Sequence, residues 1–318
     1  MPINSENLRY LYTYACHESE AELCSLELRC LFPGVTLPPD HDAFIHSRRL
    51  DPSRSPFLKQ RLRIEIDAAS PEELLERAAG LSAGERTFRV RYAKTGAPGQ
   101  PDNEGRLALE RQLGMAIHGE PDLRRPETVF GAALLNGRWL CGEMASAEPV
   151  WLRQNAKPRQ YSTALPARAA RAAVNIAVPE IPGIRALDPC CGIGTVLLEA
   201  LSMDIDIRGA DLNPLAAVGA RENLRHFGYP EELVRIADMR SLEGRYDAAL
   251  LDMPYNLCSV SPPEEQLEML ASLRRLAGRA VILTTEPIEP LIREAGFSIR
   301  ETCRLTKGSF VRFLHLCD

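Results

Sequence analysis

Strand-like and helix-like segments alternate regularly from residue 184 onward, and this alternation limits the possible folds more than any other feature of the sequence. Short aliphatic runs are separated by longer segments of helical character. This order is typical of a parallel sheet wound by right-handed crossovers. The predicted strands are 185–187, 206–210, 233–236, 247–251, 279–284, 298–305 and 310–316, and the predicted helices are 195–203, 214–227, 263–276 and 288–295.

The link between the last two predicted strands is only Thr306-Lys307-Gly308-Ser309. A link this short cannot hold a crossover helix and suits an antiparallel pair. We therefore predict an α/β, Rossmann-like sheet that is parallel except for a C-terminal antiparallel hairpin. Such an ending is unusual for dinucleotide dehydrogenases.

The first 150 residues lack this regular order, and predict a small α+β domain. Asn136-Gly137 separates two apolar runs, 128–135 and 138–143, and is the strongest short signal for a hairpin. We predict an α+β domain over 1–150, a linker and leading helix (166–178) over 151–180, and the α/β domain over 181–318. The other N-terminal segments with strand or helix character are 10–15, 18–30, 62–66, 71–79, 88–92 and 105–117.

Composition excludes several classes of protein. With 318 residues and 45% apolar content, the chain can bury a core in each of two domains. No apolar run approaches the ~20 residues that span a bilayer, and Met1 leads into a polar segment, so we expect a cytoplasmic protein without membrane contact. The nine cysteines have no C-x-x-C spacing and the histidines no ligand or triad spacing, so we predict no metal site.

The charge of the chain is unevenly distributed. A net charge of -5 is unusual for a nucleic-acid-binding protein, but residues 1–180 hold 23 basic and 23 acidic side chains, against 15 and 20 in 181–318. Lys59 and Arg61 belong to a basic stretch, 48–63, whose one acid is Asp51. An RNA contact and an ordinary solvated face both explain this stretch.

A glycine turn closes the first predicted strand of the α/β domain. Gly192 and Gly194 lack Cβ, so the backbone can turn sharply and a ligand can approach closely, beside a helix start that favours an anion. The dehydrogenase pattern G-x-G-x-x-G would place a third glycine at Leu197, and its absence argues against NAD. Asp211 ends the second strand, where an acid can accept both hydroxyls of a ribose or cap the turn before Pro214.

The tetrapeptide Asp252-Met253-Pro254-Tyr255 ends a later apolar run. An amine conjugated to a purine is a poor nucleophile because its lone pair is delocalised into the ring. The Asp252 carboxylate and the Met253 carbonyl can accept its hydrogens and stabilise the positive charge that develops on it. Tyr255 would stack on a base that has left its helix. A simple strand-ending turn is the alternative.

With these motifs, the sequence resembles the class I S-adenosylmethionine-dependent methyltransferases over about 165–318. Within them it is similar to the THUMP-containing RNA guanine methyltransferases, which modify the exocyclic amino group of a guanosine in tRNA. The segment 122–126 looks like the core of a THUMP domain, which that family uses on tRNA ends. The motifs that carry the resemblance are Asp188-Pro189-Cys190-Cys191-Gly192-Ile193-Gly194-Thr195 with Glu199, Gly209-Ala210-Asp211-Leu212-Asn213-Pro214, and Asp252-Met253-Pro254-Tyr255.

The resemblance implies a role for each motif. Asp188 would bind the methionine end of the cofactor, and Asp238 would accept from its adenine amino group. Arg159 and Tyr161, ahead of the leading helix, would contact RNA, although a linker bound to the domain surface explains them nearly as well. The cofactor contacts implied are Asp188, Pro189, Cys190, Gly192, Gly194, Thr195, Asp211 and Asp238.

Met253 departs from the family pattern D-P-P-Y, which puts rate or substrate identity in doubt more than reaction class. We expect an RNA methyltransferase that uses S-adenosylmethionine on the 2-amino group of a guanosine, with catalytic positions Asp252, Met253, Pro254 and Tyr255. Two alternatives stay open. One is amino-methylation of rRNA or DNA, and the other is an RNA-binding protein whose cofactor pocket is inactive or depends on a partner subunit.

Overall fold

The computed structural model describes residues 8–161, 164–254, 262–307 and 310–318. Contacts between residues divide the chain into two compact units. The first unit comprises Met1–Ala15 and Gly34–Glu148, and the second comprises Cys16–Pro33 and Pro149–Asp318. No helix in the described residues is long and apolar enough to cross a bilayer.

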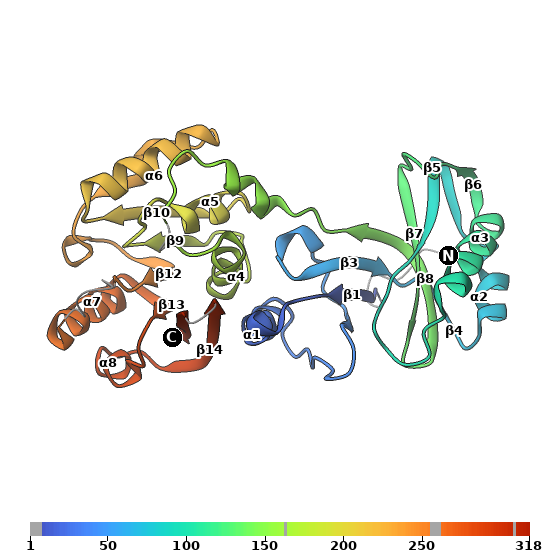
Figure 1. Cartoon of the computed structure of the whole chain (residues 1–318), viewed down its shortest axis with the longest axis horizontal. Helices are drawn as coiled ribbons and strands as arrows, with labels where there is room; N and C mark the ends of the chain where they lie inside the picture. The colour runs from blue at the N-terminus through green and yellow to red at the C-terminus, as the bar shows by residue number, and fades with distance from the viewer. Residues whose placement is uncertain (1–7, 162–163, 255–261, 308–309) are drawn as a thin grey trace. The chain divides into compact units, whose positions relative to one another are not determined.

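The first unit is built on a sheet of eight strands in the order β2-β1-β3-β8-β7-β5-β6, with β4 paired to β8 (Figure 1). Two helices, α2 and α3, bury Leu74, Ala78, Leu109 and Leu113 against one face of it. The elements are β1 (Tyr10–Tyr14), β2 (Ala43–His46), β3 (Leu58–Arg63), β4 (Ile66–Ala68), α2 (Pro71–Ala78), β5 (Ser82–Tyr92), α3 (Asn103–Ala116), β6 (His118–Pro121), β7 (Thr128–Leu135) and β8 (Arg138–Ser146).

The predicted hairpin is confirmed. β7 and β8 are antiparallel, and Leu135 pairs with Arg138 across the turn. Asn136 and Gly137 both have positive φ, 50° and 73°, as a two-residue hairpin of this hand requires. β2 and β6 were not predicted, because β2 has only four residues and the sequence of β6, His118–Pro121, shows no apolar alternation.

The second unit has a sheet of seven strands in the order β11-β10-β9-β12-β13-β15-β14. β15 is antiparallel to both of its neighbours, and the other pairs are parallel, so the predicted fold class is confirmed. The elements are α1 (Ala21–Leu31), α4 (Ala167–Ala177), β9 (Arg185–Asp188), α5 (Thr195–Leu201), β10 (Asp206–Asp211), α6 (Pro214–His226), β11 (Val234–Ile236), β12 (Tyr246–Asp252), α7 (Pro263–Leu276), β13 (Ala277–Thr284), α8 (Glu289–Glu294), β14 (Ile299–Lys307) and β15 (Phe310–Cys317).

Helices cover both faces of this sheet. α7 and α8 pack on one face, where Leu273 and Ile292 join Ala280 and Ile282 of β13 in a core. Side chains alternate along a strand, so Val281 and Leu283 point to the opposite face. α4 packs on β12 and β13 from that face, and α5 packs on α4.

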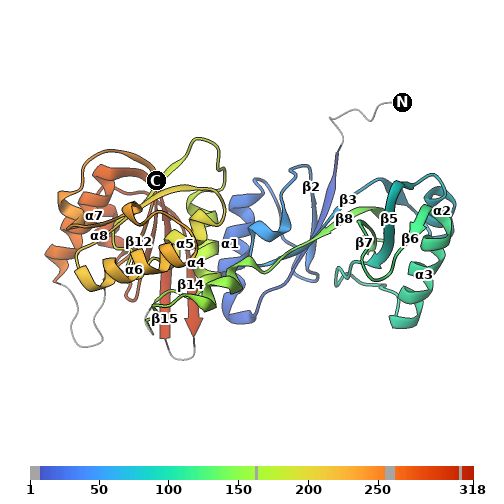
Figure 2. The same ribbon diagram turned by 90° about the horizontal axis from the view of Figure 1, so that it is seen from above.

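The helix α1 belongs to the second unit, although it lies within the range 1–150 that was predicted as one domain. It packs on α4 and β14 (Figure 2). Asn175 Nδ2 donates a hydrogen bond of 2.6 Å to Glu27 Oε1, and both side chains are fully buried. An amphipathic helix carries no local sign of which core it joins, so sequence order alone assigned it to its neighbours.

Candidate functional site

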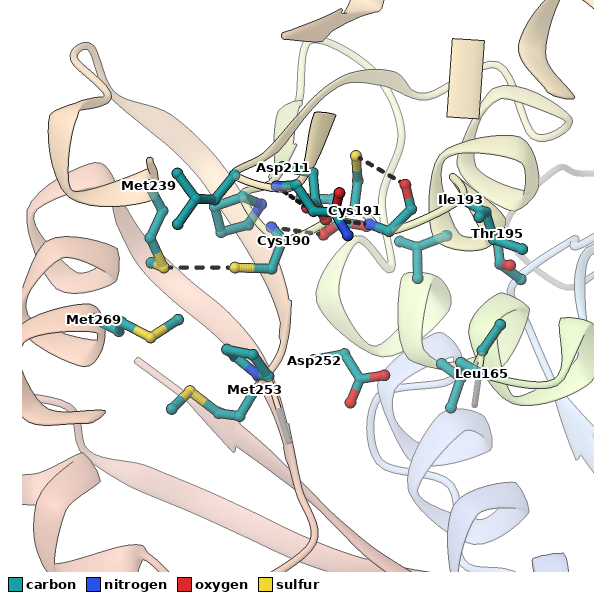
Figure 3. A pocket seen from close by; sticks show the side chains of 18 of the residues that line it. Leu165, Cys190, Cys191, Ile193, Thr195, Asp211, Met239, Asp252, Met253 and Met269 are labelled. Carbon is teal, nitrogen blue, oxygen red and sulfur yellow. Dashed lines mark hydrogen bonds between the residues drawn. The ribbon is translucent and has the colours of Figure 1, made fainter. Parts of the chain in front are cut away.

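A pocket of about 550 Å³ opens at the carboxyl ends of β9, β10 and β12 (Figure 3). The chain runs outward from β9 to β10 and β11, then returns to the other side of β9 as β12. Ligands of open α/β sheets bind at such a switch point. The predicted positions Asp188, Pro189, Cys190, Gly192, Thr195, Asp211, Asp238, Asp252, Met253 and Pro254 all line the pocket.

The glycine turn forms one wall of the pocket. Gly192 and Gly194 have φ values of +53° and +80°, which residues with a Cβ rarely adopt. A Cβ on Gly192 would meet no protein atom within 4 Å, so this part of the turn is open to a ligand. A Cβ on Gly194 would lie 3.3 Å from Ala220 Cβ, so this glycine lets α6 pack closely.

Asp211 holds the turn in place. Its Oδ2 accepts from the Gly192 N–H and its Oδ1 from the Asn213 N–H, both at 2.8 Å. Asn213 itself caps α6 by accepting from the Leu215 N–H. A carboxylate has about four acceptor sites, so Asp211 keeps capacity for ligand hydroxyls beside its role in the turn.

The other two predicted acids differ in their environments. Asp188 is buried, and burial raises its pKa well above the usual value of a carboxyl. Asp238 is held by the Arg240 guanidinium at 2.6 Å, and this hydrogen bond lowers the pKa of Asp238. It therefore stays ionised, with Arg240 beside it at the pocket wall.

Asp252 lies at the end of β12, and its carboxylate points into the pocket (Figure 3). Burial raises the pKa of Asp252 to about 6, and Arg312 opposes this rise. Arg312 Nη2 lies 3.5 Å from Asp252 Oδ2. The Met253 N–H donates to Leu283 O at 2.9 Å, which fixes the start of the turn. Tyr255 falls outside the described residues.

Sulfur-containing side chains form an apolar wall. Cys190 Sγ lies 3.7 Å from Met239 Sδ, and Met253 and Met269 line the same side (Figure 3). Burial raises the pKa of the Cys190 thiol, which keeps it neutral. Soft, polarisable groups of this kind suit a flat aromatic ring. Among the described residues, no group of three or more potential metal ligands occurs.

A buried polar network behind the turn was not predicted from the sequence. Lys157 Nζ donates to Thr195 Oγ1 at 2.9 Å, and Gln154 Nε2 donates to Glu199 Oε1 at 2.5 Å. Arg171 pairs with Glu199 at 2.7 Å, with both side chains at most 3% exposed. The network ties the linker to the first turn of α5. Its only sequence signal was five polar residues on the linker and on predicted helices, namely Gln154, Lys157, Arg171, Thr195 and Glu199.

The four residues predicted to contact RNA differ in their partners and in their exposure. Arg159 forms an ion pair with Glu222, and its backbone exchanges two hydrogen bonds with Asn223, so it binds the linker to α6. Arg61 donates to Leu50 O and lies over the ring of Tyr10. Tyr161 is 52% exposed at the pocket rim, and Lys59 is exposed on β3.

The pocket has the chemistry that S-adenosylmethionine requires. The glycine turn at Gly192, which we call the cradle, lets a ligand approach the backbone closely. The carboxylates Asp188, Asp211 and Asp252 complement a ligand with ammonium and sulfonium charges. A positive charge near Asp188 favours its ionised form. The sulfur-lined wall suits the adenine ring. The residues present therefore fit this cofactor.

The strand order, the single antiparallel strand and the pocket at the switch point define the second unit as a class I methyltransferase fold. Comparison with known proteins agrees with this class, because residues 154–290 match the family described as RMKL-like, methyltransferase domain. The resemblance to methyltransferases that the sequence motifs predicted is thereby confirmed for residues 154–290.

The chain is also similar to two named relatives and to one solved structure. The chain is 32% identical over 213 residues to the tRNA (guanine(10)-N2)-dimethyltransferase of Methanothermobacter thermautotrophicus, a match to 61% of this chain and 62% of that protein. It is 28% identical to the mouse U6 snRNA (guanine-N(2))-methyltransferase THUMPD2, over 60% of this chain and 36% of that protein. The chain thus spans less than two thirds of either relative. TrmN from Thermus thermophilus is 22% identical, with a TM-score of 0.48 and coverage of 98% and 99%.

Proposed function

We propose that this chain is an RNA methyltransferase that transfers a methyl group from S-adenosylmethionine to the exocyclic 2-amino group of a guanosine in tRNA. The observation that carries the proposal is the Asp252 carboxylate, which ends β12 and points into the cofactor-sized pocket. The names of the two relatives, one acting on tRNA and one on snRNA, support guanosine as the target. We also propose that the protein acts in the cytoplasm.

Different residues of the pocket contact different parts of S-adenosylmethionine. When bound, S-adenosylmethionine supplies an electrophilic methyl group on a positively charged sulfur. Asp211 accepts hydrogen bonds from ribose hydroxyls, and Asp238 accepts from an amino group at the adenine edge. The apolar side chains Leu165, Met239 and Met269 line the pocket and exclude water from its interior.

Asp252 and Met253 act on the nucleobase. The Asp252 carboxylate accepts a hydrogen bond from the exocyclic amine, and the Met253 carbonyl accepts the second hydrogen. These two acceptors draw the amine out of conjugation and hold its lone pair toward the pocket. As positive charge develops on nitrogen, the carboxylate stabilises it and takes up the proton that is released. With a pKa of about 6, Asp252 is largely ionised at neutral pH and still able to accept that proton.

Labelled methyl transfer to unmodified tRNA tests this proposal. The wild-type chain should transfer label, and Asp252→Ala should lower the rate by about 100-fold or more, since a charge-stabilising acceptor and general base is lost. Asp206→Ala, which removes an exposed acid on β10, should keep the wild-type rate. Label in DNA or rRNA but not in tRNA would favour the alternative substrates. No transfer by the wild-type chain, or full transfer by Asp252→Ala, would contradict the proposal.

A further inference from the structure

A buried lysine lies directly behind the wall of the pocket, and the binding roles given above do not use it. Lys157 follows the short helix η4 (Val150–Ala156), and 9% of its surface is exposed. Its Nζ donates a hydrogen bond of 2.9 Å to Thr195 Oγ1 and lies 3.5 Å from Gln154 Oε1. Thr195 lines the pocket, so a single hydroxyl group connects the Lys157 ammonium to the pocket interior.

The polar network around Lys157 has one more cation than anion. Glu199 Oε2 pairs with Arg171 at 2.7 Å, and Glu199 Oε1 accepts from Gln154 at 2.5 Å. Both oxygens of Glu199 thus have other partners, and the salt bridges among the described residues do not include Lys157. Burial lowers the pKa of Lys157, and the charge of Glu199 opposes this fall. Because a buried ammonium without an anion is costly, the network favours an anion on the pocket side of Thr195.

The pocket wall itself is poor in positive charge. The described residues that line it include one base, Arg240, and five acids, Asp188, Asp211, Asp238, Asp252 and Glu265. Arg240 pairs with Asp238 at 2.6 Å and with Glu268 at 3.2 Å. S-adenosylmethionine has a carboxylate at its methionine end, and the acids that suit its ammonium and sulfonium groups repel that carboxylate. The carboxylate therefore needs a positive charge from behind the wall.

The position of Thr195 fits the methionine end of the cofactor. Figure 3 shows Met239 and Thr195 on opposite sides of the pocket, with Asp252 between them. If adenine lies on the sulfur-lined wall and the methyl group beside Asp252, the methionine end lies on the side of Thr195. The Thr195 hydroxyl can donate to it, because an ammonium has no acceptor and Lys157 therefore uses only the oxygen of that hydroxyl.

We propose that Lys157 is a positioning residue for the carboxylate of S-adenosylmethionine and acts through the Thr195 hydroxyl; this rests on the cofactor of the function proposed above. The ammonium polarises the hydroxyl, fixes the direction of its hydrogen and supplies the positive charge that the wall lacks. The bound carboxylate in turn favours the charged form of Lys157. A linker residue outside the glycine turn thereby selects a cofactor with an intact amino-acid end.

The test compares two ligands in calorimetric titrations of the full chain. One is S-adenosylhomocysteine, and the other is its decarboxylated form, which keeps the adenosine, the sulfur and the amine. Lys157→Met removes the charge and keeps a long side chain. It should weaken binding of S-adenosylhomocysteine about tenfold or more, and binding of the decarboxylated form less than about twofold, since only the first ligand carries the anion. The control Lys94→Met removes an exposed lysine of the first unit and should change neither affinity.

Variants of Thr195 test whether Lys157 acts through the hydroxyl. Thr195→Val removes the hydroxyl and keeps the shape of the side chain, so it should cause the same selective loss of affinity for S-adenosylhomocysteine. Thr195→Ser keeps the hydroxyl and should bind both ligands within about threefold of wild type. Lys157→Met combined with Thr195→Val should lose little more than either change alone, and losses that add in full would contradict action through Thr195.

An unchanged preference between the two ligands in Lys157→Met would overturn the proposal, because a lysine that only supports the fold affects both ligands alike. A wild-type chain that binds neither ligand would overturn it as well. Thermal unfolding checks that the variants fold, and Thr195→Val gives the same comparison should Lys157→Met not fold. If the preference changes as expected but the wild-type chain methylates no tRNA, only the proposed function fails. If tRNA is methylated and Lys157→Met keeps the wild-type preference, only this inference fails.

Discussion

At the scale of single residues, the site depends on a carboxylate whose charge is set by two opposing effects. Burial raises the pKa of Asp252 to about 6, and the Arg312 guanidinium 3.5 Å away limits that rise. Arg312 comes from the antiparallel strand β15, 60 residues further along the chain than Asp252. The hairpin that distinguishes this sheet therefore contributes to the electrostatics of the proposed active site.

This arrangement predicts the pH dependence of methyl transfer. The reaction uses the carboxylate form of Asp252, so the rate should rise as pH increases through about 6. Arg312→Gln removes the charge that lowers this pKa, so the rise should move to higher pH. Arg312→Lys keeps the charge and should stay close to wild type. Rate profiles from pH 5 to about 9 measure the shift. A shift of the Arg312→Gln profile to lower pH, or none at all, would contradict the role given to Arg312.

At the scale of elements, the turn between β9 and α5 converts a strand end into a binding site. Asp211, at the end of β10, accepts from Gly192, so two adjacent strands together shape the cradle. Behind it, the Lys157, Gln154 and Glu199 network binds the linker to α5. The cradle is thus supported from the sheet on one side and from the linker on the other.

Two glycine variants distinguish a loss of stability caused by backbone strain from a loss of ligand affinity. Gly192 and Gly183 both have positive φ, and a Cβ on either would meet no protein atom within 4 Å. Each Gly→Ala change should therefore cost a similar 1–2 kcal/mol or so of unfolding free energy, about the cost of a left-handed residue with a side chain. Only Gly192→Ala should weaken binding of S-adenosylhomocysteine, by about tenfold or more. Calorimetric titration measures this, and equal affinity in the two variants would contradict the assignment of the cradle.

The sequence predicted elements well where local patterns determine them. The alternation of aliphatic strands and helices gave the second sheet, and Asn136-Gly137 gave a hairpin, because these signals depend on neighbours in the chain. Arg312 was missed because its relation to Asp252 exists only once β15 pairs with β13.

At the scale of the whole molecule, the chain combines a unit that has the class I methyltransferase fold with a second, sheet-based unit. The methyltransferase unit is discontinuous, because α1 joins it through the buried pair Glu27 and Asn175. The predicted domain functions, RNA binding in the first unit and methyl transfer in the second, remain proposals. In these proposals, RNA binding and methyl transfer belong to different units of one chain.

Identification of the methylated nucleoside shows whether the chain methylates the 2-amino group of guanosine. Unmodified tRNA is incubated with the wild-type chain and S-adenosylmethionine, digested to nucleosides and analysed by mass spectrometry. We expect N2-methylguanosine or N2,N2-dimethylguanosine from the wild-type chain, and neither product from Asp252→Ala. Methyl groups on adenosine or cytidine, or unmodified guanosine from a protein that binds both tRNA and cofactor, would contradict it.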